Sequence, residues 1–247
     1  MDMTKRYKAV FFDLGGTLRI ALLEEPWMRH ARRKMAEIAG SPVPYEEFYQ
    51  MVEERYEPYR KWALGENKES GDEELWCKWL LPDYDQTRIR QVCHELSFQY
   101  RQCKGRRVVV DGGVEVIKGL HERGYKLGII SNLIGENEVP DWLEEDGLDR
   151  YFDAVVLSSV CHMRKPCFEI YQLAAREMGV ELKDCVSVAD NIKRDIPGAK
   201  KAGVGCNIIF SSPEKKHPVE FTEENRPDAV VEDFREILDL LPPLRRN

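Results

Sequence analysis

The chain has 247 residues and a mass of 28.8 kDa, which is enough for one large hydrophobic core or for a core with an inserted module. Hydrophobic residues make up 43% of the chain and charged residues 33%, so disordered, collagen-like and fibrous proteins are excluded. The net charge of −7 argues against a protein dedicated to binding nucleic acid.

Cysteine usage and the N-terminal sequence favour a cytoplasmic location. The seven cysteines are odd in number, lie far apart and contain no CxxC pair, so we expect reduced thiols. The first ten residues include basic side chains but no long apolar run and no small-residue cleavage site, which argues against a secretory signal. No stretch is long and apolar enough for a membrane span, so we expect no membrane partner.

The first predicted element is a buried strand over residues 7–12. Its sequence, YKAVFF, is a continuous apolar run that ends at Asp13 and is followed by the pair Gly15 and Gly16, which indicates a tight loop. Continuous apolar strands are typical of a parallel sheet that helices cover on both faces.

The next segment, from about residue 20 to residue 104, holds helical patterns and no convincing strand. We predict four helices there, separated by Gly, Pro and Asn, over residues 27–39, 45–64, 73–81 and 87–103. An α-helical module is therefore predicted between the first and second strands. Two chain crossings, near Arg19 and Gly105, would join it to the rest and act as a hinge.

Strands and helices alternate after residue 105. Strand-length apolar runs occupy residues 126–131, 154–158, 185–189, 206–210 and 228–231. Helical patterns, several of them closed by a glycine, occupy residues 114–123, 142–146, 168–178, 192–202 and 234–241. The alternation predicts right-handed βαβ units. We therefore expect an α/β fold with a doubly wound parallel sheet, in which residues 1–19 and 105–247 form the core and residues 20–104 form an inserted helical domain.

Carboxylates gather where two of the predicted strands end. Asp13 follows the first strand, and Asp190 and Asp195 follow the strand over residues 185–189. Ligands bind at the carboxyl edge of open α/β sheets, so these side chains would share one site if the two strands are neighbours. Carboxylate oxygens suit Mg²⁺ better than Zn²⁺, and the five histidines show no zinc-binding spacing. A magnesium site is therefore expected; the alternative is that Asp190 and Asp195 only stabilise the start of a helix.

Two further segments could hold an anion at the same edge. Ser131 and Asn132 end the run LGIISN, where a hydroxyl group and free backbone N–H groups would lie. Lys165 precedes a helix and would bring a compact positive charge to a phosphate. The alternatives are a strand-ending turn without a ligand and a solvated lysine.

Four segments resemble, in chain order, the four motifs of the haloacid dehalogenase (HAD) superfamily of hydrolases. They are FFDLGGTL, GIISN, RKPCFEIY and VADNIKRDIPGAKKAG. The helical insert between the first two motifs resembles the C1 cap of that family. The resemblance implies a Mg²⁺-dependent phosphatase that acts on a small organic phosphate.

The resemblance also implies roles for individual residues. Asp13 would be the nucleophile that forms an aspartyl phosphate, and Lys165 would neutralise the transferring phosphoryl group. The side chains implied to bind the substrate phosphate are Ser131, Asn132 and Thr17. The implied metal ligands are two carboxylates and one backbone carbonyl, from Asp13, Asp190 and Gly15. The side chains implied to support them are Asp195 and Asn191.

One position departs from the phosphatase pattern of the family. Those phosphatases carry a second aspartate two residues after the nucleophile, and this chain has Gly15 there. A glycine has no side chain to move a proton, and general acid–base catalysis is typically worth about 10²- to 10⁴-fold in rate. A good leaving group would need that help less.

Gly15 leaves two alternatives open. The first is a phosphonatase-like enzyme that cleaves a carbon–phosphorus bond through a Schiff-base lysine of the insert, with the candidates Lys34, Lys61, Lys68 and Lys78. The second is a protein whose weakened phosphate site binds a ligand or a protein partner without turnover.

Overall fold

The computed structural model describes residues 7–211 and 221–244. Residues 1–6, which contribute to the argument against a secretory signal, lie outside the described residues. Within the described ranges no helix has both the length and the apolar character needed to cross a membrane. All seven cysteines are free thiols.

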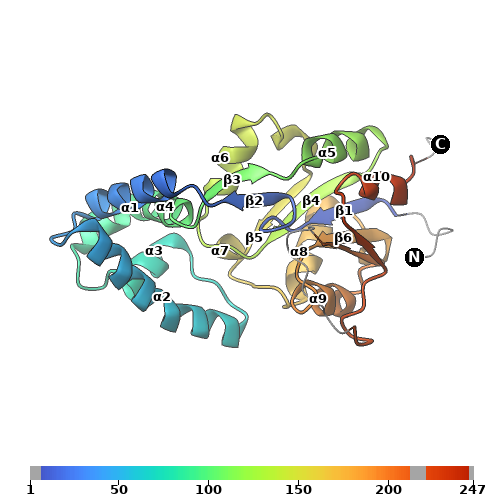
Figure 1. Ribbon diagram of the computed structural model, residues 1–247. Coiled ribbons are helices and arrows are strands. Elements are labelled where there is room, and N and C mark those ends of the chain that lie inside the picture. Colours follow the sequence, from blue (N-terminus) through green and yellow to red (C-terminus); the bar gives the residue numbers. More distant parts are fainter. Residues whose placement is uncertain (1–6, 212–220, 245–247) are drawn as a thin grey trace.

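Six parallel strands form the central sheet (Figure 1). Their bounds, in the order of the strands across the sheet, are β5 (Ala154–Leu157), β4 (Lys126–Ser131), β1 (Ala9–Phe12), β6 (Cys185–Ala189), β7 (Cys206–Phe210) and β8 (Ala229–Val231). The chain builds outward from β1 on one side and then on the other, so the predicted doubly wound fold is confirmed. The carboxyl ends of β4, β1 and β6 meet where the order reverses, which is where such sheets bind ligands.

Helices cover both faces of this sheet (Figure 1). The helices packed on one face are α5 (Gly113–Glu122), α6 (Glu138–Glu145) and α10 (Glu236–Leu240). Those on the other face are α8 (Glu169–Met178) and α9 (Asp195–Ala202). The shorter helical segments of the core are α7 (Ser158–Cys161) and two 3₁₀ turns, Asp149–Tyr151 and Leu182–Asp184.

The side chains of β1 alternate between the two layers. Val10 and Phe12 belong to the hydrophobic cluster under α5 and α6, and Ala9 and Phe11 belong to the cluster under α8. All four are buried, because β1 has neighbouring strands on both sides and helices above and below it. A strand in this position places the residue that follows it, Asp13, at the centre of the sheet edge.

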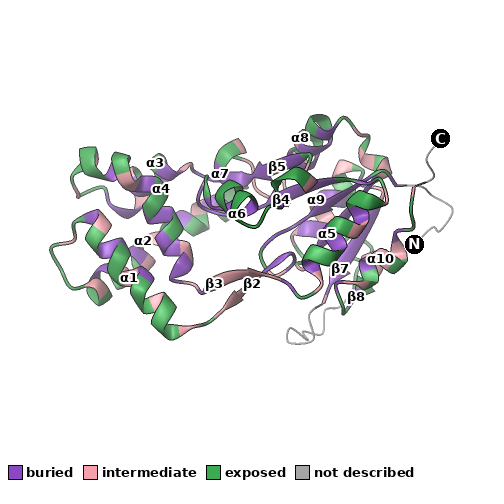
Figure 2. Cartoon of the chain, turned by 90° about the horizontal axis from the view of Figure 1, so that it is seen from above, coloured by how far each residue is buried: buried purple, intermediate pink, exposed green. Residues whose placement is uncertain are grey.

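The segment between the first two core strands is helical, as predicted. It contains α1 (Glu25–Ala39), α2 (Tyr45–Glu66), α3 (Asp72–Glu74), a π-helix (Leu75–Leu80) and α4 (Gln86–Gln102). We call these helices the insert. They share a hydrophobic cluster in which Phe48 and Trp76 are fully buried, and Ile134 from the core joins that cluster. Figure 2 shows the buried residues on the inner sides of these helices.

The two chain crossings are paired strands, which the sequence analysis missed. β2 (Arg19–Leu22) and β3 (Arg106–Val109) form an antiparallel ribbon between the insert and the core (Figures 1 and 2). The expectation of no strand in residues 20–104 is therefore wrong at residues 20–22. Two strands of four residues give little periodic signal, and their pairing joins segments far apart in the sequence. The ribbon lies at the expected boundaries of the helical domain, and those boundaries stay a prediction.

A buried carboxylate connects the insert to the core. Glu69, which follows α2, is 2% exposed and accepts hydrogen bonds from Tyr59 of the insert and from Ser158 and Arg164 of the core. Burial raises the pKa of Glu69, and the charge of Arg164 opposes that shift. Arg164 immediately precedes Lys165, so the insert holds the segment that carries a predicted site residue.

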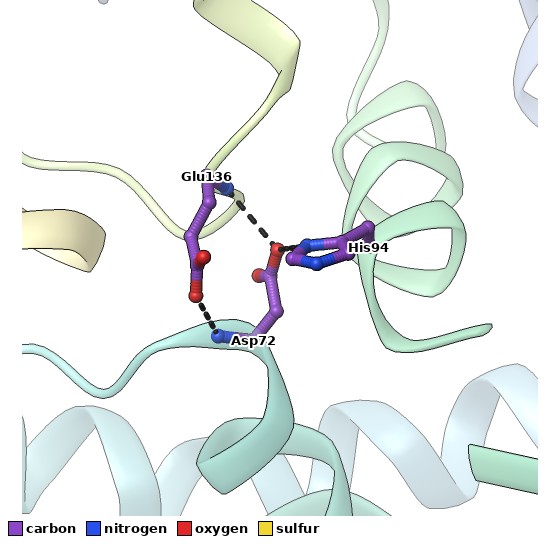
Figure 3. A group of neighbouring side chains, drawn as sticks. All are labelled: Asp72, His94 and Glu136. Carbon is purple, nitrogen blue, oxygen red and sulfur yellow. Dashed lines mark hydrogen bonds and ion pairs between the residues drawn. The ribbon is translucent and has the colours of Figure 1, made fainter. Parts of the chain in front are cut away.

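A second group of side chains crosses the same junction (Figure 3). Asp72 of α3 accepts hydrogen bonds from Ser97 of α4 and from the backbone N–H of Glu136 in the core, and its Oδ2 lies 2.7 Å from Nδ1 of His94. Glu136 in turn accepts a hydrogen bond of 2.7 Å from the backbone N–H of Asp72. Both oxygens of Asp72 have partners, so this group docks the insert on the loop after β4.

The Glu69 contact can be tested by Glu69→Gln. This variant keeps the shape of the side chain but replaces charge-assisted hydrogen bonds by neutral ones, so it should lower the free energy of unfolding by about 1.5–3 kcal/mol. The control is Glu74→Gln, which removes the exposed ion pair with Lys78 and should cost much less. Urea unfolding followed by circular dichroism measures both variants. Equal losses would contradict the buried connection.

Candidate active site

Asp13 lies at the carboxyl end of β1, between the ends of β4 and β6. It is 4% exposed, and its backbone N–H donates to the carbonyl oxygen of Val188 at 2.9 Å. This hydrogen bond continues the pairing of β1 with β6, so the sheet itself sets the direction in which the Asp13 carboxylate points. Thr17 is fully buried and donates from its hydroxyl group to Oδ2 of Asp13 at 3.4 Å.

Lys165 lies between two carboxylates. Its Nζ is 2.7 Å from Oδ1 of Asp13 and 2.8 Å from Oδ1 of Asp195, and it donates to the carbonyl oxygen of Ile130 at 2.9 Å. These contacts match the three donors of a lysine ammonium group, and all three charged side chains are buried. The sequence prediction that Lys165 and Asp13 meet at one sheet edge agrees with this geometry.

Asn132 holds the backbone of Lys165. Its side-chain Nδ2 donates to the carbonyl oxygen of Lys165, and its Oδ1 accepts from the N–H of Lys165, both at 2.8 Å. The two polar atoms of the amide are therefore used for positioning Lys165. Ser131, which ends β4, is 3% exposed and lines a cleft of about 1020 Å³ together with Gly15.

A glycine in α9 allows close packing against the segment that follows Lys165. A Cβ atom added at Gly198 would lie 2.8 Å from the carbonyl oxygen of Pro166 and 3.0 Å from its Cα atom. Backbone atoms cannot turn aside as a side-chain tip can, so a larger residue at Gly198 would displace Pro166 or α9. Gly198, the first glycine of the segment DIPGAKKAG, therefore contributes to the position of Lys165.

Arg194 is a residue of the site that the sequence analysis missed. Its Nη2 lies 3.4 Å from Oδ2 of Asp13, 3.9 Å from Oδ1 of Asp190 and 3.0 Å from Oδ2 of Asp195. Arg194 is the N-cap residue of α9, where a cation is unfavourable because the N-terminal end of a helix carries partial positive charge. An arginine at that place in the sequence was the available signal that acidic partners lie nearby.

The charges in the site shift the pKa values of its acids in opposite directions. Burial raises the pKa of Asp13, against the opposing effect of the Lys165 ammonium group. Burial also acts on Asp195, but the positive charges of Lys165 and Arg194 outweigh it and lower the pKa of Asp195. The carboxylate of Asp195 is therefore held in its ionised form as the partner of both cations.

Three carboxylates come close enough to share a cation. Asp13, Asp190 and Asp195 each offer an oxygen atom, and these three atoms lie within 4.8 Å of one another. Asn191 accepts a hydrogen bond from the backbone N–H of Arg194 through Oδ1, and its carbonyl oxygen accepts one from the N–H of Asp195. Asn191 therefore shapes the turn that presents these carboxylates. An all-oxygen donor set fits Mg²⁺, so the residues present are chemically suited to that ion.

The four lysines considered for a Schiff base lie elsewhere. Lys34, Lys61, Lys68 and Lys78 are all exposed, and none of them lines the cleft that contains Gly15 and Ser131. Lys78 forms an ion pair with Glu74 on the surface. Among the described residues, the insert therefore supplies no lysine to this cleft.

Comparison with protein families gives a match over residues 7–203 to the model described as haloacid dehalogenase-like hydrolase. One curated relative is a glyceraldehyde 3-phosphate phosphatase from Methanopyrus kandleri, 28% identical over 97% of this chain and 99% of that protein. Another is the pyrophosphatase PpaX from Halalkalibacterium halodurans, 30% identical over 53% of this chain and 59% of that protein. The chain thus aligns with somewhat more than half of the length of PpaX.

Solved structures share the fold. A 2-haloacid dehalogenase from Pseudomonas syringae pv. Tomato superposes with a TM-score of 0.69 at 21% identity, covering 95% of this chain and 98% of that one. A HAD phosphatase from Thermococcus onnurineus superposes with a TM-score of 0.59 at 23% identity, covering 97% of this chain and 100% of that one. At these identities the likeness is one of fold.

The two buried ion pairs of Lys165 predict that Lys165→Met strongly lowers the free energy of unfolding. The variant leaves Asp13 and Asp195 buried without their ammonium partner, so the free energy of unfolding in metal-free buffer at neutral pH should fall by about 3–5 kcal/mol. Lys8→Met, which removes an exposed lysine paired with Asp184, is the control and should have little effect.

The loss of folding stability in Lys165→Met should depend on pH. The folded-state pKa of Asp195 lies below its unfolded value, which is about 3.9, so its contribution is present at neutral pH and is lost as the pH falls through the folded-state pKa. The difference in stability between the wild type and Lys165→Met should therefore narrow below about pH 4. A difference that stays constant from neutral pH into this range would contradict the assignment.

Proposed function

The chain belongs to the haloacid dehalogenase-like hydrolases, and we propose that it is a Mg²⁺-dependent phosphatase of small organic phosphates. The observation that carries the proposal is the position of Asp13: a buried carboxylate, held by Lys165, beside two further aspartates and two residues before Gly15, which lines a cleft. The phosphatase names of the curated relatives support the same reaction class.

In the proposed reaction, an oxygen of Asp13 attacks the phosphorus atom of the ester. A bond forms between that oxygen and phosphorus, the bond from phosphorus to the ester oxygen breaks, and the ester oxygen takes the electron pair and leaves as an alkoxide that solvent protonates. A water molecule then attacks the phosphorus of the aspartyl phosphate, releases inorganic phosphate and restores the Asp13 carboxylate. The rigid strand end and the Lys165 contact hold the nucleophile in one direction throughout.

Asp13 and Asp190 would hold Mg²⁺, with the backbone carbonyl of Gly15 as a third ligand. The ion supplies positive charge that offsets repulsion between the carboxylate and the anionic phosphate. Asp195 keeps Lys165 and Arg194 in place, and Asn191 keeps the turn that presents Asp190 and Asp195. These residues are positioning groups in the proposed reaction.

In the proposed reaction, the transferring phosphoryl group would interact with the Lys165 ammonium group and the Ser131 hydroxyl group. The Lys165 ammonium group is fixed by three contacts before the substrate arrives, so it stabilises charge on the phosphoryl oxygens without a cost of reorganisation. Ser131 lies at the end of the neighbouring strand β4 and lines the cleft, where its hydroxyl group would bind the phosphate. Thr17 and Asn132 act on Asp13 and Lys165.

Gly15 leaves the leaving alcohol without a proton donor at the place where phosphatases of the family carry an aspartate. The backbone there can accept a side chain, because a Cβ atom added at Gly15 meets no heavy atom within 4 Å. The φ angle of Gly16, by contrast, is 86°, a conformation that favours glycine. The absence of a side chain at Gly15 is therefore not imposed by packing. We infer that the enzyme prefers esters whose alcohol leaves without protonation, or obtains the proton from water or substrate.

Leu23, which follows β2, and Arg101 of the insert line the cleft, and we infer that residues 20–104 act as a cap over the site. The contacts of Glu69 and Asp72 with the core support this, because they tie the insert to the two loops that carry Lys165 and Glu136. The β2–β3 ribbon is the connection about which such a cap would move.

The proposal predicts that phosphate release depends on Asp13 and on the metal. Wild-type protein should release phosphate from p-nitrophenyl phosphate with Mg²⁺ and lose that activity with EDTA. Asp13→Asn should reduce turnover to background, because an amide oxygen is a poor nucleophile and a poor ligand for Mg²⁺. Asp184→Asn, which changes an aspartate paired with Lys8 on the surface, is the matched control and should retain activity. If the wild-type protein released no phosphate from any ester tested, the proposal would be overturned.

A second prediction concerns Gly15. Gly15→Asp should raise kcat/KM on glycerol 3-phosphate, an unactivated ester, by up to about 10²- to 10⁴-fold. The same variant should gain much less on p-nitrophenyl phosphate, whose leaving group needs little protonation. Gly15→Asn has nearly the same size but cannot donate and recover a proton as an acid, so it should show no such gain. Equal gains in the two variants would argue against a missing acid.

A further inference from the structure

Three arginines meet where the ribbon joins the core: Arg19 of β2, Arg101 of α4 and Arg107 of β3. We call them the arginine cluster. A single buried carboxylate, Glu138 of α6, serves this cluster. Its Oε1 accepts from Nη1 of Arg19 at 3.3 Å, and its Oε2 accepts from Nε of Arg101. Both oxygens of Glu138 are therefore occupied by two of the three arginines.

Arg19 is a structural member of the cluster. It is 7% exposed, and its guanidinium group lies over the ring of Trp142 at 4.4 Å from the ring centroid. Glu138 on one side and Trp142 on the other satisfy this charge with a hydrogen bond and a cation–π contact. Arg19 lines a separate hollow of about 710 Å³ and does not line the cleft that contains Gly15 and Ser131.

Arg107 forms no ion pair with any residue that the structure describes, and the charge of Glu138 reaches it only without a hydrogen bond. Its Nε is shielded from solvent and makes no hydrogen bond within the described part of the chain. Burial lowers the pKa of Arg107 to about 10; the charges of Arg101 and Arg19 add to this effect, and the charge of Glu138 opposes it. A guanidinium group that is partly desolvated, close to two like charges and paired directly with no carboxylate is stabilised when an anion binds it.

The exposed carboxylates nearby leave Arg107 unpaired. Asp141, Glu145 and Asp146 line the 710 Å³ hollow on the other side of Arg107, but none of them forms an ion pair with it in the described structure. Asp146 accepts from the indole N–H of Trp142. These side chains are hydrated at the surface and screened.

Arg107 lines the cleft that also contains Gly15 and Ser131. Arg101 and Arg107 are the only cationic side chains among the described residues that line this cleft. The core contributes carboxylates to the same lining, from Asp111, Glu232, Asp233 and Glu236, and Arg235 pairs with Asp111 and Asp233. An anion that enters this cleft is therefore attracted to the arginines of the insert and the ribbon. The cleft, at about 1020 Å³, is far larger than a phosphate group requires.

From this arrangement we propose that the substrate carries a second anionic group, besides the phosphate that is transferred, and that Arg107 binds it with help from Arg101. The proposal rests on the proposed phosphatase function and narrows its substrate class to phosphorylated acids or bisphosphates. The planar guanidinium group of arginine matches a carboxylate or a phosphate with two parallel hydrogen bonds. Arg107 is thus assigned as a specificity residue that gains a direct ion-pair partner when the substrate binds.

The test compares three substrates of similar size. Glycerol 3-phosphate has a neutral remainder, 3-phosphoglycerate has a carboxylate, and propane-1,3-diol bisphosphate has a second phosphate. For wild-type protein, kcat/KM for at least one of the two doubly anionic substrates should exceed that for glycerol 3-phosphate by about 10- to 100-fold, the effect of a charge-assisted hydrogen-bonded pair. The better of the two identifies the second group as carboxylate or phosphate.

Arg107→Met should remove most of this preference, and Arg107→Lys should keep a part of it because the charge remains. Arg106→Met is the matched control. Arg106 is the neighbour of Arg107 on β3, forms an ion pair with Glu24 and does not line the cleft, so its loss should leave the preference unchanged. An equal rate on all three substrates in the wild type, or an unchanged preference in Arg107→Met, would overturn the inference while leaving the phosphatase proposal intact.

Calorimetric titration keeps the inference testable without turnover. Wild-type protein should bind 3-phosphoglycerate or the bisphosphate more tightly than glycerol 3-phosphate, and Arg107→Met should lose that difference. Tighter binding of the doubly anionic compounds without phosphate release would contradict the proposed function and support the anion site. Phosphate release from all three esters with no difference in binding would support the proposed function and contradict the anion site.

Discussion

The contact on which the site depends is the ammonium group of Lys165 between the carboxylates of Asp13 and Asp195. Burying three charges in one place is costly unless each finds its partner at short range, and here the distances from Nζ are 2.7 and 2.8 Å. The rest of the local structure serves that requirement. The pairing of β1 with β6 sets the direction of the Asp13 side chain, and Asn132 fixes the backbone of Lys165. The close packing of α9 at Gly198 places Asp195, the first residue of α9, near Lys165.

The cleft that contains Gly15 and Ser131 is lined by charges of both signs. The carboxylates come from the core, whereas Arg101 and Arg107 come from the insert and the ribbon. Electrostatic attraction acts at longer range than hydrogen bonding, so these arginines would orient the anionic substrate proposed for this site. The insert therefore contributes charge as well as cover, and the ribbon that connects it carries Arg107 directly into the cleft.

Much of the fold and part of the site could be predicted from sequence. The apolar strand before Asp13 and the alternation of strands and helices after residue 105 led to the doubly wound sheet, which the structure confirms. The β2–β3 ribbon could not be predicted, because two four-residue strands acquire their stability only from each other. Arg194 and Arg107 were missed for a related reason: a basic residue is assumed to be solvated until the fold shows which charges surround it.

The sequence by itself determined the order of the elements, the residues at the strand ends and the loss of a side chain at Gly15. Local patterns carry that information, because strand length, apolar runs and glycine positions depend on neighbouring residues. Only the tertiary structure decided which charges become partners: Lys165 with Asp195, Glu138 with two arginines, and Arg107 in no ion pair with a described residue. The physical reason is that the energy of a charge depends on burial and on distances across the fold, and no spacing along the chain encodes either quantity.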